Sequence, residues 1–313
     1  TGSYTDFPAD ESNMKVLARL DWNISDKHHL ALRYNFTNNT GWNGPNMTSM
    51  DGGTRSAYAR TSLYSMAFAN SMYSMNNLVH SVSLDLNSNI NDKLSNQFLA
   101  TFSKLDDVRG TNSSEFPFID IMDGTGTNTP YMSLGYELFT WNNAVHNTVA
   151  NIKDDLVYYA GNHKVTMGLS YEYQMADNAY MRNGTGYYRY DSIDDFINGN
   201  APEVVCLTYG YDGEMNPAAR VQFHKAGIYA QDEWSVSENF KLTYGLRLDG
   251  LFFDNSDLMT NQAIYELDYN GRHIDTGKWP SAGVTVSPRI GFTWDILKDN
   301  SLTMRGGTGL FSG

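Results

Sequence analysis

Five stretches of the chain alternate apolar and polar residues on both sides of a short polar turn. In the first stretch the apolar positions before and after the turn at residues 25–28 are Met14, Val16, Ala18, Leu20, Trp22, Leu30, Leu32, Tyr34 and Phe36. A period of two is typical of a strand with one apolar and one polar face. The first stretch therefore predicts an antiparallel β-hairpin.

The other four stretches have turns near residues 91, 162, 238 and 299, where Asn, Asp and Gly supply the backbone conformations that tight turns need. The third hairpin is irregular, because Asp154 has the parity of the apolar residues Ile152 and Leu156. We expect a β-bulge there that restores the alternation. Five hairpins predict about ten strands.

Four long segments separate the hairpins, at about 38–76, 107–143, 176–219 and 254–284. Loops of this length are uncommon in compact soluble domains and are usually functional or disordered. Short turns at one rim and long loops at the other are typical of a transmembrane β-barrel. We therefore predict an all-β fold, an antiparallel transmembrane β-barrel segment with short periplasmic turns and long extracellular loops, as one partial barrel domain over residues 1–313.

The barrel prediction places the apolar face of each strand against lipid. The residues expected to face outward are Leu20, Trp22, Leu246, Leu248, Phe292 and Trp294. The chain has a mean hydropathy of -0.46 and no apolar run of about eighteen residues, so it is too polar for a helical membrane protein. A barrel requires only every second strand residue to be apolar.

The charge and the candidate chemistry exclude several functions. A net charge of -13 and a pI near 4.8 argue against nucleic-acid binding, which requires a basic surface. The acidic pairs, such as Asp194-Asp195, do not predict a glycosidase, because neighbouring residues on a strand point to opposite faces. The lone Cys206 forms no internal disulfide, and no metal-ligand motif is present. We expect no enzyme, no cofactor and no bound metal.

The long segments contain the aromatic residues that could contact a ligand. The candidate ligand-binding residues are Trp42, Trp141, Tyr187, Tyr188, Arg189, Tyr190 and Trp279. Within 176–219, three tyrosines and an arginine in succession offer flat stacking surfaces and a charge. The alternative is that these rings pack on one another within folded loops.

Three segments resemble a known family. DFPADESNMKVLARLDWNISDKHHLALRYNF, GIYAQDEWSVSENFKLTYGLRLD and SPRIGFTWDILKDNSLTMRGGTGLFSG are similar to the barrel of TonB-dependent outer-membrane transporters, particularly the Oar-like branch. The resemblance implies a bacterial outer-membrane receptor with a large plugged barrel of about 22 strands, which imports a nutrient with energy from TonB. No plug, TonB-contacting box or closing strand is recognised, so the chain is expected to be a central part of the barrel.

The same resemblance implies the partners and the lining of the lumen. The expected partners are outer-membrane lipid, the TonB complex through an N-terminal region absent from this chain, a nutrient ligand and a surface lipoprotein. The residues expected to line the lumen are Arg19, Arg33, Arg247, Asp249, Arg289, Asp295 and Arg305.

Two alternatives remain open. The first is a passive porin or an adhesin barrel. The second is a soluble all-β carbohydrate-binding or hydrolytic protein, whose apolar strand residues would form a core.

Overall fold

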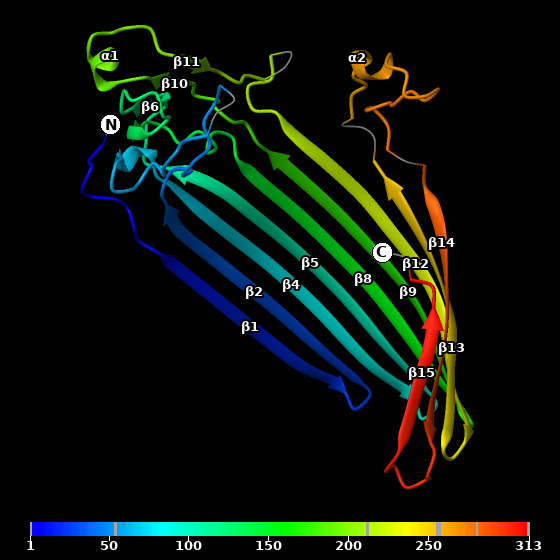
Figure 1. The fold of residues 1–313 in the computed structure, drawn as a ribbon. Coiled ribbons are helices and arrows are strands. Elements are labelled where there is room, and N and C mark those ends of the chain that lie inside the picture. Colours follow the sequence, from blue (N-terminus) through cyan, green and yellow to red (C-terminus); the bar gives the residue numbers. More distant parts are fainter. Residues whose placement is uncertain (1, 53–54, 211–212, 255–257, 280, 312–313) are drawn as a thin grey trace.

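The main body of the protein is one ten-stranded antiparallel sheet (Figure 1). The computed structural model describes residues 2–52, 55–210, 213–254, 258–279 and 281–311. The strands of the sheet, in order, are β1 (Ser12–Ser25), β2 (His28–Asn43), β4 (Tyr73–Asn91), β5 (Leu94–Thr111), β8 (Ala144–Ala160), β9 (His163–Ala179), β12 (Ala218–Ser237), β13 (Phe240–Phe253), β14 (Gly283–Asp295) and β15 (Thr303–Gly309). Within this sheet, each strand pairs with the sheet strand that comes before it and the one that comes after it along the chain.

The connections confirm the predicted hairpins. All five short turns lie at one end of the strands, and the four long connections lie at the other end (Figure 1). The first turn, for example, needs only Asp26 and Lys27 between β1 and β2. In the described residues β1 and β15 each pair with one neighbour only, so the sheet is open.

The two faces of the sheet differ as the alternation predicts. On the apolar face Leu20 is 61% exposed, Trp22 57%, Leu246 46% and Trp294 40%, while Leu248 and Phe292 are half-buried. None of these six residues packs into a core. A soluble sandwich would bury them, so their exposure argues against the soluble alternative and for a surface that lipid covers.

The predicted β-bulge in the third hairpin is wrong. β8 and β9 pair without a break from Ala144 opposite Ala179 to Ala160 opposite His163. Asp154 consequently lies on the apolar face, where its Oδ1 accepts a hydrogen bond of 2.7 Å from Asn96 Nδ2 on β5. The amide of Asn96 satisfies this carboxylate oxygen, so the strand keeps its register.

Aromatic residues lie on the apolar face near the short turns and at the middle of the strands. Trp22, Trp234 and Trp294 have apolar-face parity close to the short turns. Farther up the strands, the hydroxyl of Tyr34 lies 2.8 Å from His80 Nδ1 and that of Tyr171 lies 2.7 Å from His224 Nδ1. Aromatic side chains with a polar end favour the boundary between hydrocarbon and water, so the three tryptophans fit one boundary of a membrane-spanning wall.

The long connections are more ordered than the sequence predicts, and the strands extend into the expected loops. The connections contain a second, five-stranded sheet in the order β11 (Val204–Cys206), β10 (Tyr187–Tyr190), β6 (Phe118–Met122), β7 (Pro130–Leu134) and β3 (Met66–Ala67). They also contain the short helices η1 (Ala69–Ser71), α1 (Ile193–Ile197) and α2 (Gln262–Tyr265). No helix among the described residues is long and apolar enough to cross a membrane.

Candidate functional site: lid, mouth and wall

Three of the four long connections combine into one structure, the lid, which comprises the described residues of 44–72, 112–143 and 180–217. The second sheet joins them, because β10 pairs in parallel with β6 and β3 pairs in parallel with β7. The backbone N–H of Phe118 also donates to the carbonyl of Gly186 at 2.9 Å. The fourth connection, which carries α2, stands apart from the lid at the same rim (Figure 1).

The lid is built around a buried ion pair. Arg60 Nη2 and Nε donate to the two oxygens of Asp120 at 2.6 and 2.9 Å, and both side chains are fully buried. The hydroxyls of Tyr187 and Ser133 also donate to Asp120, at 2.9 and 2.6 Å. A carboxylate that is taken out of water needs such a complete set of donors.

Two buried residues of the lid, Arg60 and Tyr187, have raised pKa values. Burial by itself would lower the pKa of Arg60, but the Asp120 carboxylate, together with Tyr187 and Glu137, outweighs burial and raises that pKa above its ordinary value. Burial, and then the adjacent Asp120, raise the pKa of Tyr187 strongly. Tyr187 is therefore a neutral hydrogen-bond donor inside the lid.

A second arginine holds two of the connections together. Arg189 Nη1 donates to the carbonyl of Asp51 at 2.9 Å, and its Nε lies 3.1 Å from Glu203 Oε2. The side chain of Asp51 in turn forms an ion pair of 3.1 Å with Arg182 and accepts from Asn183 at 2.5 Å. Arg189 is only 2% exposed, so in this arrangement it stabilises the lid from within.

The seven candidate ligand-binding residues do not lie together in the structure. Tyr187 is fully buried, and Tyr188 and Tyr190 pack against the buried residues of β6 and β7. Trp141 lies edge-on to Tyr136, with ring centroids 5.8 Å apart. Five of the seven thus belong to the lid, where Trp141, Tyr187 and Tyr190 each contact another aromatic ring.

The other two candidates lie elsewhere. The unbroken register of β2 and β4 gives Trp42 the parity of the apolar face. Trp279, on the fourth connection, stacks on Phe253 with ring centroids 4.9 Å apart and planes 18° apart. Phe253 in turn contacts Phe223, its register partner on β12, at 6.0 Å.

We call Phe223, Phe253 and Trp279 the mouth aromatics. Phe223 and Phe253 have polar-face parity at the ends of their strands beside the long connections. The sequence analysis missed both, although an aromatic residue at a polar-parity position next to a long loop was a usable signal. Each of the three rings remains partly exposed.

The seven residues predicted to line a lumen all have polar-face parity. Arg19 forms an ion pair of 2.6 Å with Asp21, and Arg247 forms one of 2.7 Å with Asp249. The eleven cationic residues with this parity are Lys15, Arg19, Arg33, Arg109, Lys153, Lys164, Lys225, Lys241, Arg247, Arg289 and Arg305. The eight acidic ones are Asp21, Asp85, Asp107, Asp155, Glu172, Glu233, Asp249 and Asp295. The polar face is therefore slightly basic, although the whole chain is acidic.

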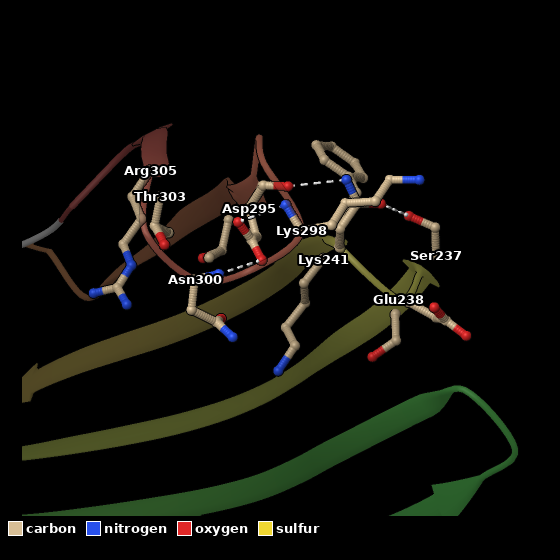
Figure 2. Close-up of a pocket in the computed structure, with 12 residues that line it drawn as sticks. Ser237, Glu238, Lys241, Asp295, Lys298, Asn300, Thr303 and Arg305 are labelled. Carbon is tan, nitrogen blue, oxygen red and sulfur yellow. Dashed lines mark hydrogen bonds between the residues drawn. The ribbon is translucent and has the colours of Figure 1, made fainter.

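A cavity of about 550 Å³ opens on the polar face at the short-turn end of β12–β15 (Figure 2). Its charged lining residues are Glu238, Lys241, Asp295, Lys298 and Arg305. Asp295 caps the last turn, since its carboxylate accepts from the backbone N–H groups of Lys298 and Asn300 at 3.1 and 3.0 Å. The cavity borders β15, one of the two open edges of the sheet, so its outer boundary depends on what pairs with that strand.

The part of the chain that the structure describes contains no candidate metal site. No group of three or more His, Cys, Asp or Glu side chains there is arranged to hold a metal ion. Cys206 is half-buried, and burial raises the pKa of its thiol, which disfavours the reactive thiolate.

Solved structures with the same fold are outer-membrane transporters. The transporter YddB from Escherichia coli matches 94% of this chain at 14% identity and a TM-score of 0.57. The copper transporter OprC matches 97% at 12% identity, and the ferric citrate transporter FecA matches 96% at 10% identity, both with a TM-score of 0.52. This chain covers only 31%, 37% and 36% of those three chains.

No curated protein sequence matches the chain. The family model described as an outer membrane beta barrel domain matches residues 1–313. This match confirms the predicted antiparallel barrel fold and the location in the bacterial outer membrane, and it agrees with the expectation that the chain is not an enzyme. With its ten-stranded wall, its lipid-type outer face and the match over its full length, the chain belongs to the outer membrane β-barrel domain family.

Proposed function

We propose that residues 1–313 form part of the wall of a TonB-dependent receptor that binds a nutrient outside the cell and imports it through a plugged barrel. The main observation behind this proposal is the lid. A folded structure at one end of a charged wall is suited to bind one ligand selectively. The likeness to transporter barrels supports it. Since the chain covers about a third of those proteins, the plug and the remaining strands would lie elsewhere in the same polypeptide.

The proposal gives each face a role. Lipid covers the apolar face, and the polar face lines the lumen, with Arg19, Arg33 and Arg247 among its charged groups. The TonB complex acts through the N-terminal region outside this chain. A surface lipoprotein that contacts the lid is a further partner consistent with this architecture.

The mouth aromatics are the best-placed contact for the ligand. Their rings contact one another, with Trp279 stacked on Phe253, and stay partly exposed where the polar face meets the long connections. Flat aromatic surfaces bind apolar or planar parts of a ligand at low entropic cost. In this proposal Trp279 contacts the ligand, whereas Tyr187 and Arg189 keep the lid in shape.

Transport by the full-length protein tests the proposal. Reconstituted in liposomes, a plugged receptor leaves the vesicles impermeable to arabinose, whereas a passive porin makes them swell. In cells, uptake of labelled ferric citrate or copper, the cargoes of two proteins with this fold, should require the receptor and should stop when TonB is deleted. Swelling in arabinose, or uptake that persists without TonB, would contradict the proposal.

The ligand contact is tested by point variants of the same protein. Trp279→Ala should weaken capture of the cargo about five- to tenfold, because removing one stacking partner costs about 1 kcal/mol. Phe252→Ala is the matched control, since Phe252 is adjacent to Phe253 but has apolar-face parity and is 46% exposed. Equal affinities for the two variants would reject the mouth aromatics as the contact.

A further inference from the structure

The apolar face of the wall has a hollow of about 520 Å³ where β8, β9, β12 and β13 lie side by side. The apolar side chains that line it are Leu156, Met167, Leu169, Ile228, Ala230, Leu246 and Leu248. Among the described residues, Asp154 is the one charged group in this lining. A carboxylate thus borders a hollow on the face of the wall that lipid covers.

The hollow continues along the strands as a groove. A second hollow of about 390 Å³ shares Leu169 and Ile228 with the first and extends toward the long connections. We call the two together the outer groove. It forms because the small residues Ala226, Ala230 and Gly250 lie beside larger side chains that project from the face, such as Ile228, which is 61% exposed.

Asp154 lies near the middle of the membrane-spanning part of its strand. It is six residues before Ala160, the last residue of β8. At about 3.3 Å per residue and a strand tilt of about 40°, this places Asp154 about 15 Å above the short turn. The apolar band of such a wall is about 25 Å tall, so hydrocarbon lies both above and below this carboxylate.

One oxygen of Asp154 has no hydrogen-bond donor in the part of the chain that the structure describes. Asn96 Nδ2 donates to Asp154 Oδ1 at 2.7 Å and to the carbonyl of Asp155 at 3.2 Å, which uses both of its protons. The register partners of Asp154 and its neighbours on the same face are the apolar residues Phe98, Leu169, Ile152 and Leu156. The wall therefore leaves Asp154 Oδ2 for an occupant of the groove.

The chemistry of this position selects the occupant. Plain hydrocarbon offers no donor, and an ionisable group at this depth is costly and marks a functional site. A cation could pair with the carboxylate, but the cation would itself have to leave water for the middle of the membrane. A hydroxyl group donates one proton without bringing a second charge into the hydrocarbon.

The size of the groove favours a lipid over a protein partner. A stable protein interface buries about 800 Å² on each partner, whereas sites for small molecules measure about 300–1,000 Å³. The two hollows of about 520 and 390 Å³ lie in the second range. Their arrangement along the strands fits an extended hydrocarbon chain.

We propose that the outer groove binds a lipid whose hydrocarbon chain carries a hydroxyl group. The hydroxyl donates to Asp154 Oδ2, and the chain lies over Ala230 and Ala226. This inference concerns the outside of the wall, so it requires neither a plug nor TonB and does not depend on the proposed function. It gives a role to a carboxylate that plain hydrocarbon would leave unsatisfied.

A competition between two lipids tests the role of Asp154. The full-length protein is mixed with equal amounts of stearoyl phosphatidylcholine and the same lipid hydroxylated at mid-chain, and native mass spectrometry measures which one is bound. The protein should prefer the hydroxylated lipid about fivefold, the effect of one added hydrogen bond. Asp154→Leu should abolish the preference, whereas Asp154→Asn keeps a carbonyl acceptor and should retain a preference of about twofold.

The groove itself is tested by filling it. Ala230→Phe should lower the amount of bound hydroxylated lipid about fivefold, because the ring would occupy the space of the chain. Ala18→Phe is the matched control, since Ala18 has apolar-face parity on β1, outside the groove. This variant should bind the lipid as the unmodified protein does.

Each opposite result overturns the inference. Equal binding of the two lipids would exclude a hydroxyl contact, and a preference that survives Asp154→Leu would exclude Asp154 as its acceptor. Equal loss of lipid in Ala230→Phe and Ala18→Phe would exclude the groove. A benzophenone amino acid at position 228 should capture lipid in native outer membranes, and an adduct with a protein, including a second copy of this chain, would overturn the lipid as the occupant.

Discussion

The lid and the wall are stabilised in opposite ways. The lid buries its ion pair and its aromatic rings in the manner of a small water-soluble domain, with Arg60, Asp120 and Phe118 fully enclosed. The wall has almost no core, and its largest apolar side chains point away from the protein. The wall is held by the backbone hydrogen bonds between its ten strands and by lipid, whereas the lid is held by side chains that contact one another.

The lid and the wall also differ in their charged residues. The three lid connections contain eleven acidic and four basic residues, whereas the polar face of the wall contains eight acidic and eleven basic ones. The two regions should therefore respond differently to the loss of a charge. In the lid a charge is needed where it is buried, and in the wall a new charge should cost more on the apolar face than on the polar face.

The largest effect is expected from the buried ion pair. Asp120→Ala leaves Arg60 buried without its partner, and the free energy of unfolding of the lid should fall by about 3–5 kcal/mol. Hydrogen exchange of the full-length protein should show loss of protection over β6, β7 and β10, with the ten-stranded sheet unchanged. Asp123→Ala, in the exposed turn after β6, is the control and should leave the lid protected. Equal protection in both variants would mean that the ion pair does not hold the lid.

The next effect distinguishes the two faces of the wall. Leu246→Arg places a cation against lipid and should lower the free energy of unfolding by roughly 2–4 kcal/mol, whereas Thr243→Arg on the polar face should cost little. Urea titration of the full-length protein, followed by its heat-modified mobility on gels, measures both. If the two variants were equally stable, the assignment of the faces would be wrong.

A smaller effect of opposite sign is expected at Asp154. This carboxylate lies on the apolar face, so Asp154→Leu should raise the free energy of unfolding by about 1 kcal/mol, less than the cost of a misplaced cation. Asp154→Asn keeps an acceptor for Asn96 and removes only the charge, so it should give much of the same gain. A loss of stability in both variants would contradict the placement of Asp154 against lipid.

The smallest effect concerns pH and again separates the lid from the wall. The raised pKa of Tyr187 means that the folded lid keeps a proton that the unfolded lid loses above the ordinary tyrosine value of 10.0. The stabilisation is complete below that pH and is lost as the pH rises above it. Protease cleavage within the lid should therefore increase between about pH 9 and about pH 11, and Tyr187→Phe should reduce this dependence. A cleavage rate that does not change over this range would contradict the burial of Tyr187.

The sequence by itself determined the wall. Strict alternation, as in Leu30, Leu32 and Tyr34, sets the strands, the two faces and the side on which the long connections lie, because a strand reverses the direction of every second side chain. The irregular position at Asp154 was misjudged, since local parity cannot reveal the hydrogen bond from Asn96 on another strand.

Only the tertiary structure decided the lid and the details of the site. The pairing of β10 with β6 and the ion pair between Arg60 and Asp120 join residues about 60 or more positions apart, and no periodic pattern marks them. The aromatic residues of the loops therefore looked alike in the sequence, whereas the fold buries Tyr187 and leaves Trp279 at the mouth. Short-range alternation determines a strand, but the contacts between loops depend on how several distant segments pack together.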